Sequence, residues 1–164
     1  IFPNAMFFVG KENFERSQTP HMRDKASFIP QLPRLLEQSN RLELVNHKDQ
    51  LEFDTVQVEF VESLGHTPGM MISCIQTPDL TIFFVGDIAP GSAWVNLPIT
   101  MGYDRFPERL IDEKQTIFDR IVKQNAWIFY THDHEYAASR LELDEQSGRF
   151  KPVNLIKTLD SLNL

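Results

Sequence analysis

Apolar residues recur along this chain in short blocks whose spacing predicts mainly β-strands. Two blocks alternate apolar with polar positions, which is the period of a strand with one buried face: residues 42–45 and 56–61. Four other blocks are almost continuously apolar, as in largely buried strands: residues 5–9, 70–76, 80–85 and 126–130. Thr77, Pro78 and Asp79 separate two of these blocks, which predicts a hairpin.

Helical periodicity is clearest at residues 107–124, where one face is apolar: Leu110, Ile111, Phe118, Ile121 and Val122. The opposite face is expected to meet water: Glu108, Asp112, Lys114, Arg120 and Lys123. A shorter helix is predicted at residues 30–37, while residues 11–27 are expected to be a polar, mobile connection. With a terminal hairpin at residues 140–153, this order predicts a single α/β layered domain over residues 1–164.

Composition narrows the classes of function. The chain has 164 residues, 41% of them hydrophobic and 24% charged, which is ordinary for one globular domain. A net charge of −7 with no Lys/Arg cluster argues against nucleic acid as a partner. No apolar run is long enough to span a bilayer, so no membrane partner is expected. The single cysteine, Cys74, lies in an apolar block, which predicts a core residue and a reducing, cytoplasmic location.

Three short motifs follow predicted strands and carry residues suited to chemistry. Ser63–Gly69 holds His66 between two glycines and a proline, 83–90 holds Asp87 beside a glycine, and 128–134 ends on two histidines. Loops at strand ends are positioned by the rigid sheet, and imidazole with carboxylate is a ligand set for zinc and similar metals. Taken singly, each residue has a plainer interpretation as a turn, cap or surface residue.

Together the motifs resemble those of the metallo-β-lactamase superfamily. Gly65-His66-Thr67-Pro68-Gly69, Gly86-Asp87 and Thr131-His132-Asp133 are similar to its later metal-ligand motifs. Further segments resemble the YtnP-like quorum-quenching lactonase subgroup: Phe2-Pro3-Asn4-Ala5, Met101-Gly102-Tyr103-Asp104 and Arg140-Leu141. The resemblance implies an αββα sandwich, of which this chain would form the C-terminal two-thirds.

That resemblance also implies a site and a reaction. His66 would bind the first metal, Asp87 would bridge both metals as the catalytic carboxylate, and His132 would bind the second. Two metals, usually zinc with iron or manganese as alternatives, would generate a bridging hydroxide that attacks a small lactone or ester-like substrate. Phosphotriester, β-lactam and thioester hydrolysis are alternatives on the same scaffold.

Two departures from the family pattern alter these expectations. The upstream His-x-His-x-Asp-His motif is absent, and Met70 stands where the family commonly has histidine. Because the upstream motif is absent, we expect an incomplete fold that has lost an upstream part, weak or no metal binding, and an inactive chain. Met70 is expected to alter the local support of the His66 loop more than metal binding itself. A homodimer would cover the exposed sheet. His134 would be a substitute ligand if the strand before it continued, placing it on the same face as His132.

The sequence allows alternatives for the residues that line the substrate pocket and for the class of function. Trp94, Tyr103 and Asp104 are candidates to line a pocket for the small-molecule substrate; alternatively Tyr103 packs and Asp104 forms a turn before the long helix. A different class of function is a metal-free family member that acts as a binding or interaction module, which the missing motif and Met70 both favour.

Overall fold

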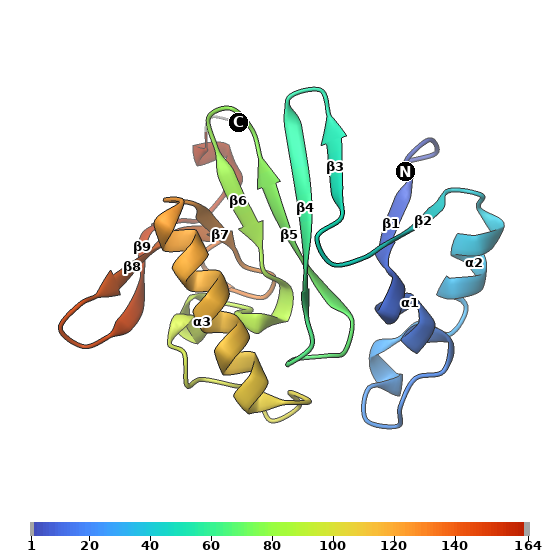
Figure 1. The fold of residues 1–164 in the computed structure, drawn as a ribbon, viewed down its shortest axis with the longest axis horizontal. Helices are drawn as coiled ribbons and strands as arrows, with labels where there is room; N and C mark the ends of the chain where they lie inside the picture. The colour runs from blue at the N-terminus through green and yellow to red at the C-terminus, as the bar shows by residue number, and fades with distance from the viewer. Residues whose placement is uncertain (1, 163–164) are drawn as a thin grey trace.

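The structure, a computed structural model, describes residues 2–162, apart from the side chain of Ser161. Two β-sheets and three α-helices form its layers (Figure 1). The smaller sheet pairs β1 with β2 in parallel: Phe7–Gly10 and Leu42–Val45. The larger sheet has seven strands in chain order: β3 Gln50–Phe53, β4 Val56–Ser63, β5 Met70–Gln76, β6 Thr81–Phe84, β7 Trp127–Phe129, β8 Ala138–Asp144 and β9 Arg149–Ile156.

The helices divide between the two sheets (Figure 1). Helices α1 (Lys11–Gln18) and α2 (Leu32–Gln38) accompany the small sheet, while α3 (Pro107–Lys123) covers one face of the large sheet. Neighbouring strands are antiparallel in the large sheet except β6 and β7, which α3 connects in parallel. Among residues 2–162, no helix has both the length and the hydropathy required to cross a membrane.

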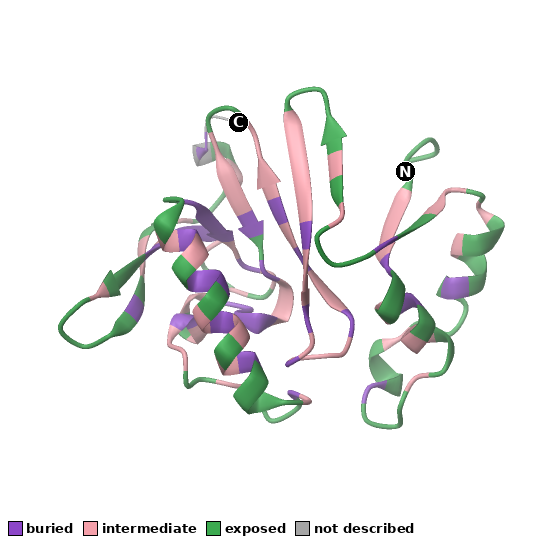
Figure 2. Cartoon of the chain, in the orientation of Figure 1, coloured by how far each residue is buried: buried purple, intermediate pink, exposed green. Residues whose placement is uncertain are grey.

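The core lies between the large sheet and α3. Cys74, Phe83 and Ile128 occupy paired positions on adjacent strands, so their side chains share one face of the sheet, and all three are fully buried. Phe118 and Ile121 of α3 belong to the same buried cluster. Figure 2 shows this burial as purple segments on the side of α3 that faces the sheet. The prediction that Cys74 is a core residue is confirmed.

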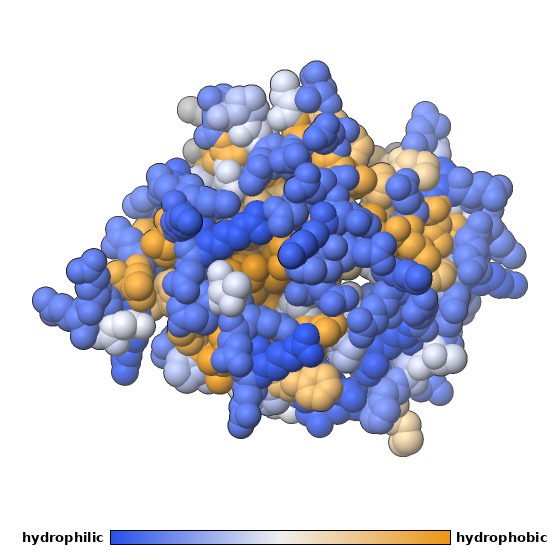
Figure 3. All heavy atoms as spheres, viewed as in Figure 1, coloured by the Kyte–Doolittle hydropathy of each residue, from blue (hydrophilic) through white to orange (hydrophobic). Residues whose placement is uncertain are grey.

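The opposite face of the large sheet is less completely covered. Phe60, Ser73, Phe84 and Phe129 share that face by register, and the rings of Phe84 and Phe129 stack with centroids 5.5 Å apart. Phe84 is nevertheless 37% exposed. The described residues therefore leave part of one apolar sheet face open to solvent. On the side of the molecule that carries α3, Figure 3 shows hydrophobic atoms between mostly hydrophilic ones.

Most predicted elements are confirmed, but the stretch 11–27 is not the irregular connection that was expected. Its first half forms α1, whose sequence is polar apart from the buried Phe14. A single apolar anchor gives no periodicity to detect, and the helix depends on packing against β1 and β2. The short strand β3 was also missed, and β1 is half-buried, with bounds Phe7–Gly10 in place of residues 5–9.

Lys114 contradicts the predicted water-facing side of α3, because it is 0% exposed. Its ammonium donates hydrogen bonds to the backbone carbonyls of Asn96, Leu97 and Ile99, at 3.0, 3.3 and 2.9 Å. Burial lowers the pKa of Lys114 to about 8, with the charge of Asp104 acting in the opposite direction, so the amine is still mostly charged at pH 7. The long aliphatic stem of Lys114 lets it cross the helix interface and hold residues 96–99 against α3.

We expect Lys114→Met to destabilise the fold by about 1–3 kcal/mol, because three backbone carbonyls lose a charged donor. Urea denaturation of the variant measures the loss as a lower midpoint. Lys123→Met, at an exposed position near the end of the same helix, is the matched control and should leave the midpoint nearly unchanged. Equal midpoints for the two variants would contradict this role of Lys114.

Candidate metal centre

The three sequence motifs meet at one edge of the large sheet. His66 lies in the loop between β4 and β5, Asp87 in a 3₁₀ turn at Gly86–Ile88 after β6, and His132 just beyond β7. Strands β4, β6 and β7 run in the same direction, since β4 and β6 are both antiparallel to β5 and β6 is parallel to β7. Their carboxyl ends therefore converge, and residues far apart in the sequence become neighbours.

Asp87 sits between two imidazoles. Its Oδ2 lies 3.3 Å from Nε2 of His66, and its Oδ1 lies 3.3 Å from Nε2 of His132. Thr131 Oγ1 also donates to Asp87 Oδ1 at 3.3 Å. The hydrogen bond from His66 lowers the pKa of Asp87 despite the opposing effect of its burial. The carboxylate thus presents one oxygen to each histidine.

Asp104 holds the other side of the His66 ring. Its buried carboxylate lies 2.7 Å from His66 Nδ1, and its second oxygen accepts the backbone N–H of Met101 at 2.5 Å. The His66 side chain is only 11% exposed. Burial alone would disfavour a charged ring, but hydrogen bonds and charges from Asp87 and Asp104 outweigh it and raise the pKa of His66. With Nδ1–H directed at Asp104, the ring turns Nε2 towards Asp87.

The backbone around His66 is held between two helices. A Cβ added at Gly65 would lie 2.5 Å from backbone atoms of Leu110 in α3. A Cβ added at Gly69, whose φ is +81°, would lie 2.4 Å from the backbone nitrogen of Asn13 in α1. Glycine is needed at both positions because the helices approach this closely. The two glycines that flank His66 therefore explain how its loop is fixed on both sides.

Glu113 of α3 is a supporting residue that the sequence did not reveal. Its carboxylate accepts the Ser63 hydroxyl at 2.6 Å and the backbone N–H groups of Leu64 and Gly65, both at 3.0 Å. These bonds anchor the start of the His66 loop to the long helix. No local signal identifies such a residue, because its partners lie about 50 positions earlier in the chain.

The end of the third motif differs from the expected continuing strand. β7 ends at Phe129, and the following residues form bends, so His132 and His134 do not share a strand face. The chain turns because Asp133 accepts the backbone N–H groups of Glu135 and Tyr136. His132 meets Asp87 although its side chain is 70% exposed, while His134 is exposed to solvent.

The three predicted pocket residues occupy different environments. Tyr103 is 63% exposed and its ring stands edge-on to His66, with centroids 5.8 Å apart. Asp104 is buried behind His66, where it supports the imidazole, so it does not line an open pocket. Its hydrogen bonds with Met101 instead fit the alternative that it forms a turn before the long helix. Trp94 packs partly buried against the main core. Of the three, Tyr103 alone is both exposed and in contact with a predicted ligand.

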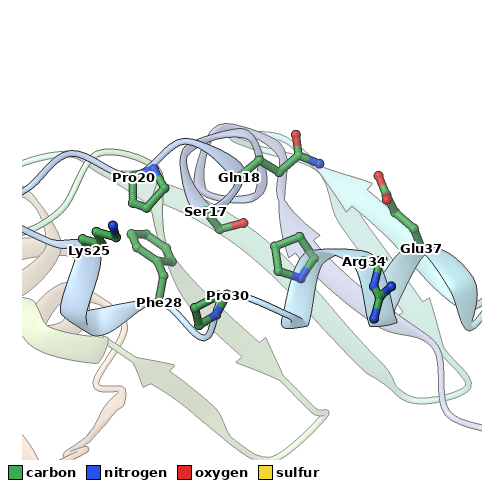
Figure 4. Close-up of a pocket in the computed structure, with 9 residues that line it drawn as sticks. Ser17, Gln18, Pro20, Lys25, Phe28, Pro30, Arg34 and Glu37 are labelled. Atoms are coloured by element: carbon green, nitrogen blue, oxygen red, sulfur yellow. The ribbon is translucent and has the colours of Figure 1, made fainter.

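A hollow elsewhere in the molecule is unrelated to this chemistry. A cavity of about 510 Å³ lies between α1 and α2, lined in part by Ser17, Pro20, Lys25, Phe28 and Arg34 (Figure 4). None of the motif residues lines it. Its size alone therefore does not make it the place where substrate meets the candidate centre.

The geometry fits part of a two-metal centre. Two atoms bound to one tetrahedral zinc at about 2.0–2.1 Å lie about 3.3–3.4 Å apart. Both separations between Asp87 oxygens and histidine Nε2 atoms are 3.3 Å, so each pair spans one edge of such a tetrahedron. Within residues 2–162, however, no group of three or more His, Cys, Asp or Glu side chains is arranged to hold a metal ion. His66, Asp87 and His132 thus suit a metal but provide only some of its ligands.

We expect Asp104→Asn to lower the pKa of His66, because the substitution removes a negative charge from the Nδ1 side of the ring. A pH titration of the imidazole resonances by NMR in the metal-free chain measures this directly. Asp112→Asn, at an exposed position on α3, serves as the control and should leave the pKa of His66 unchanged. An unaltered His66 titration in Asp104→Asn would rule out the proposed charge coupling.

Comparisons with known proteins show which solved structures share this fold. No protein-family model matches the sequence, and no curated protein matches it either. A solved structure described as a probable metal-dependent hydrolase from Staphylococcus aureus aligns with 97% of this chain and 55% of its own, at 25% identity and a TM-score of 0.75. AidC, a dizinc quorum-quenching lactonase, aligns with 96% of this chain and 56% of its own, at 17% identity and a TM-score of 0.71. AbOPH, a hydrolase in the beta-lactamase superfamily, aligns with 93% of this chain and 55% of its own, at 16% identity and a TM-score of 0.69.

The chain thus spans a little more than half the length of these structures. The similar structures include metal-dependent hydrolases and quorum-quenching lactonases, so the resemblance of this chain to the metallo-β-lactamase superfamily is confirmed at the level of the fold. The expected α/β fold class is confirmed by the same matches. This chain therefore has the metallo-β-lactamase fold, over a stretch that corresponds to about half of the superfamily hydrolases it resembles.

Proposed function

We propose that this chain carries part of the two-metal centre of a hydrolase that acts on a small lactone or ester-like substrate. The observation that supports the proposal is the Asp87 carboxylate, which offers one oxygen to each of two histidines at equal distances of 3.3 Å. Zinc is the preferred metal because its ligands are imidazole and carboxylate, with iron or manganese as alternatives.

The residues of the chain have distinct proposed roles. Two bound cations would polarise a substrate carbonyl and lower the pKa of water. His66 would bind one cation and His132 the other, while Asp87 would contact both. Asp104 would fix the tautomer and orientation of His66, as carboxylates commonly do for metal-binding imidazoles. Exposed Tyr103 would stand beside the reacting carbonyl, since its ring contacts His66 from the solvent side.

The proposed metal affinity of the chain by itself is low. Asp87 with one histidine supplies two ligand atoms per cation, whereas protein zinc sites normally use three or four protein ligands. His134 is exposed and lies beyond a turn, so it offers no ready third ligand. We therefore propose that this chain binds zinc weakly and turns substrate over slowly, if at all, without further ligands.

The proposed substrate class is supported by the similar structures. AidC is described as a lactonase in complex with a product, N-hexanoyl-L-homoserine, and AbOPH is described as a hydrolase. An acyl-homoserine lactone is therefore the first substrate to test. Phosphotriesters, β-lactams and thioesters come next, because the same scaffold chemistry acts on other electrophilic centres.

A metal-free interaction module is the second candidate function. It is favoured by the lack of any group of three or more metal-binding side chains in the part of the chain that the structure describes. It leaves unexplained why Asp87 faces two imidazoles, each through a separate oxygen. For either function we propose a cytoplasmic location, which suits a chain whose one cysteine is buried and unpaired.

Asp87→Ala is expected to weaken zinc binding more than any other single substitution in the centre, because Asp87 contacts both histidines. Calorimetric titration with zinc should give micromolar or weaker affinity for the unsubstituted chain, and about tenfold or greater weakening in the variant. Asp79→Ala, in an exposed hairpin turn, is the control. Any slow hydrolysis of an acyl-homoserine lactone that the unsubstituted chain shows with excess zinc should persist in Asp79→Ala and be lost in Asp87→Ala.

Two results would count against this account. Equal zinc affinity for Asp87→Ala and Asp79→Ala would remove Asp87 from the centre and favour the interaction module. Tight binding of about one zinc or more per chain would show that His134 or a second copy supplies a ligand, which contradicts the proposed weak centre.

Zinc binding should also weaken as the pH falls through the pKa of His66. Because that pKa is raised, a proton occupies Nε2 at pH values where an ordinary imidazole is already neutral, and it competes with the metal. Calorimetry at about pH 6 in buffers of different ionisation enthalpy should therefore show proton release on binding, and less release at about pH 8. Binding that releases no proton at either pH would mean that His66 is not a ligand.

A further inference from the structure

One carboxylate joins the loop that carries His132 to the loop that follows Asp87. Asp133 Oδ2 accepts the backbone N–H and the hydroxyl of Ser92, both at 2.7 Å. Its Oδ1 accepts the backbone N–H groups of Glu135 and Tyr136 at 2.9 and 3.0 Å. Four donors therefore converge on one side chain, and Ser92 lies 41 positions before Asp133 in the sequence.

Two further contacts fasten the same pair of loops. The backbone N–H of His132 donates to the carbonyl of Pro90 at 2.8 Å. A Cβ added at Gly91 would lie 3.1 Å from Asp133 Oδ2, so a side chain there would press on the carboxylate. The backbone at 90–92 and at 132–133 thus lies in direct contact, with Asp133 filling the space between the loops.

His132 depends on this connection more than His66 depends on its own loop. The His66 ring is buried and its Nδ1 is bonded to Asp104, so packing and a hydrogen bond fix its orientation. The His132 ring is 70% exposed, and among the described residues it forms an ion pair with Asp87 alone. With so little packing on the ring, its position is set chiefly by where the backbone places its Cα.

We propose that Asp133 is a positioning residue for the second metal position: together with Ser92 and the His132–Pro90 hydrogen bond, it forms a latch that holds His132 opposite Asp87. The role of the latch in metal binding rests on the proposed function. Its effect on the backbone does not, because the contacts are present in the chain itself. Ser92 is also the first residue of the 3₁₀ turn Ser92–Val95, which contains Trp94.

Asp133→Asn tests the latch most directly, because it changes the hydrogen-bonding groups and nearly preserves the size of the side chain. The amide keeps one oxygen for the Glu135 and Tyr136 N–H groups but places an NH₂ group where Oδ2 meets the Ser92 N–H, so two donors face each other. Ser92→Ala removes only the hydroxyl contact and should have a smaller effect. Asp79→Asn carries the same chemical change at an exposed turn and is the matched control.

Amide hydrogen exchange in the metal-free chain tests the latch without any metal. Exchange at the His132 amide should accelerate about tenfold or more in Asp133→Asn, and less in Ser92→Ala, because the His132–Pro90 hydrogen bond loses its support. Core amides such as that of Ile128 should exchange at unchanged rates. Unchanged exchange at His132, or equal acceleration throughout the core, would overturn the latch.

Zinc titration followed through the histidine ring resonances tests the effect on the metal position. The latch predicts that in Asp133→Asn the zinc concentration that half-saturates the shift of the His132 ring resonances rises by about tenfold. The corresponding concentration for the His66 resonances should change by no more than about twofold. A general loss of structure would weaken both, and this result would overturn the proposed selectivity. If neither ring of the unsubstituted chain responds more than exposed His21, the proposed function fails, and the exchange measurement alone decides on the latch.

Discussion

The candidate centre depends on a charge arrangement in which one imidazole lies between two carboxylates. Asp87 and Asp104 approach opposite nitrogens of His66, and a neutral ring can donate a proton to only one of them. Either the ring becomes protonated, which is why its pKa is raised, or a cation takes the place of the second proton. The negative charges of Asp87 and Asp104 would therefore be balanced by a second proton on His66 in the metal-free chain and by a cation in a metal-bound chain.

The sheet brings these groups together, and the helices keep them in place. β4, β6 and β7 end at one edge and deliver His66, Asp87 and His132 there. Beyond the strand ends, carboxylates tie the loops to distant parts of the chain. Glu113 and Asp104 hold the His66 loop, and Asp133, in the His132 loop itself, joins that loop to Ser92. A ligand set on loops reaches the required precision through such supporting bonds.

The sequence predicted the elements that have a local signal, and it did not predict features that depend on contacts between distant parts of the chain. Period-two alternation at β4 and helical periodicity at α3 predicted those elements, and motifs at strand ends predicted which residues would meet. α1 was missed because Phe14 is its one buried apolar residue. Lys114 was placed in water because periodicity registers charge but not the reach of a long stem to distant carbonyls. The roles of Asp104 and Glu113 depend on partners 38 to 50 positions away.

Charge balance gives a physical reason for the weak metal affinity proposed for this chain by itself. In the described residues Asp87 is the one carboxylate that meets both ligand histidines, because Asp104 faces the distal nitrogen of His66. Two divalent cations would bring more positive charge than these two carboxylates balance, and this excess would oppose metal binding by the chain alone. The same excess would lower the pKa of water held at the centre, so the charge that opposes metal binding is also the charge that would generate hydroxide.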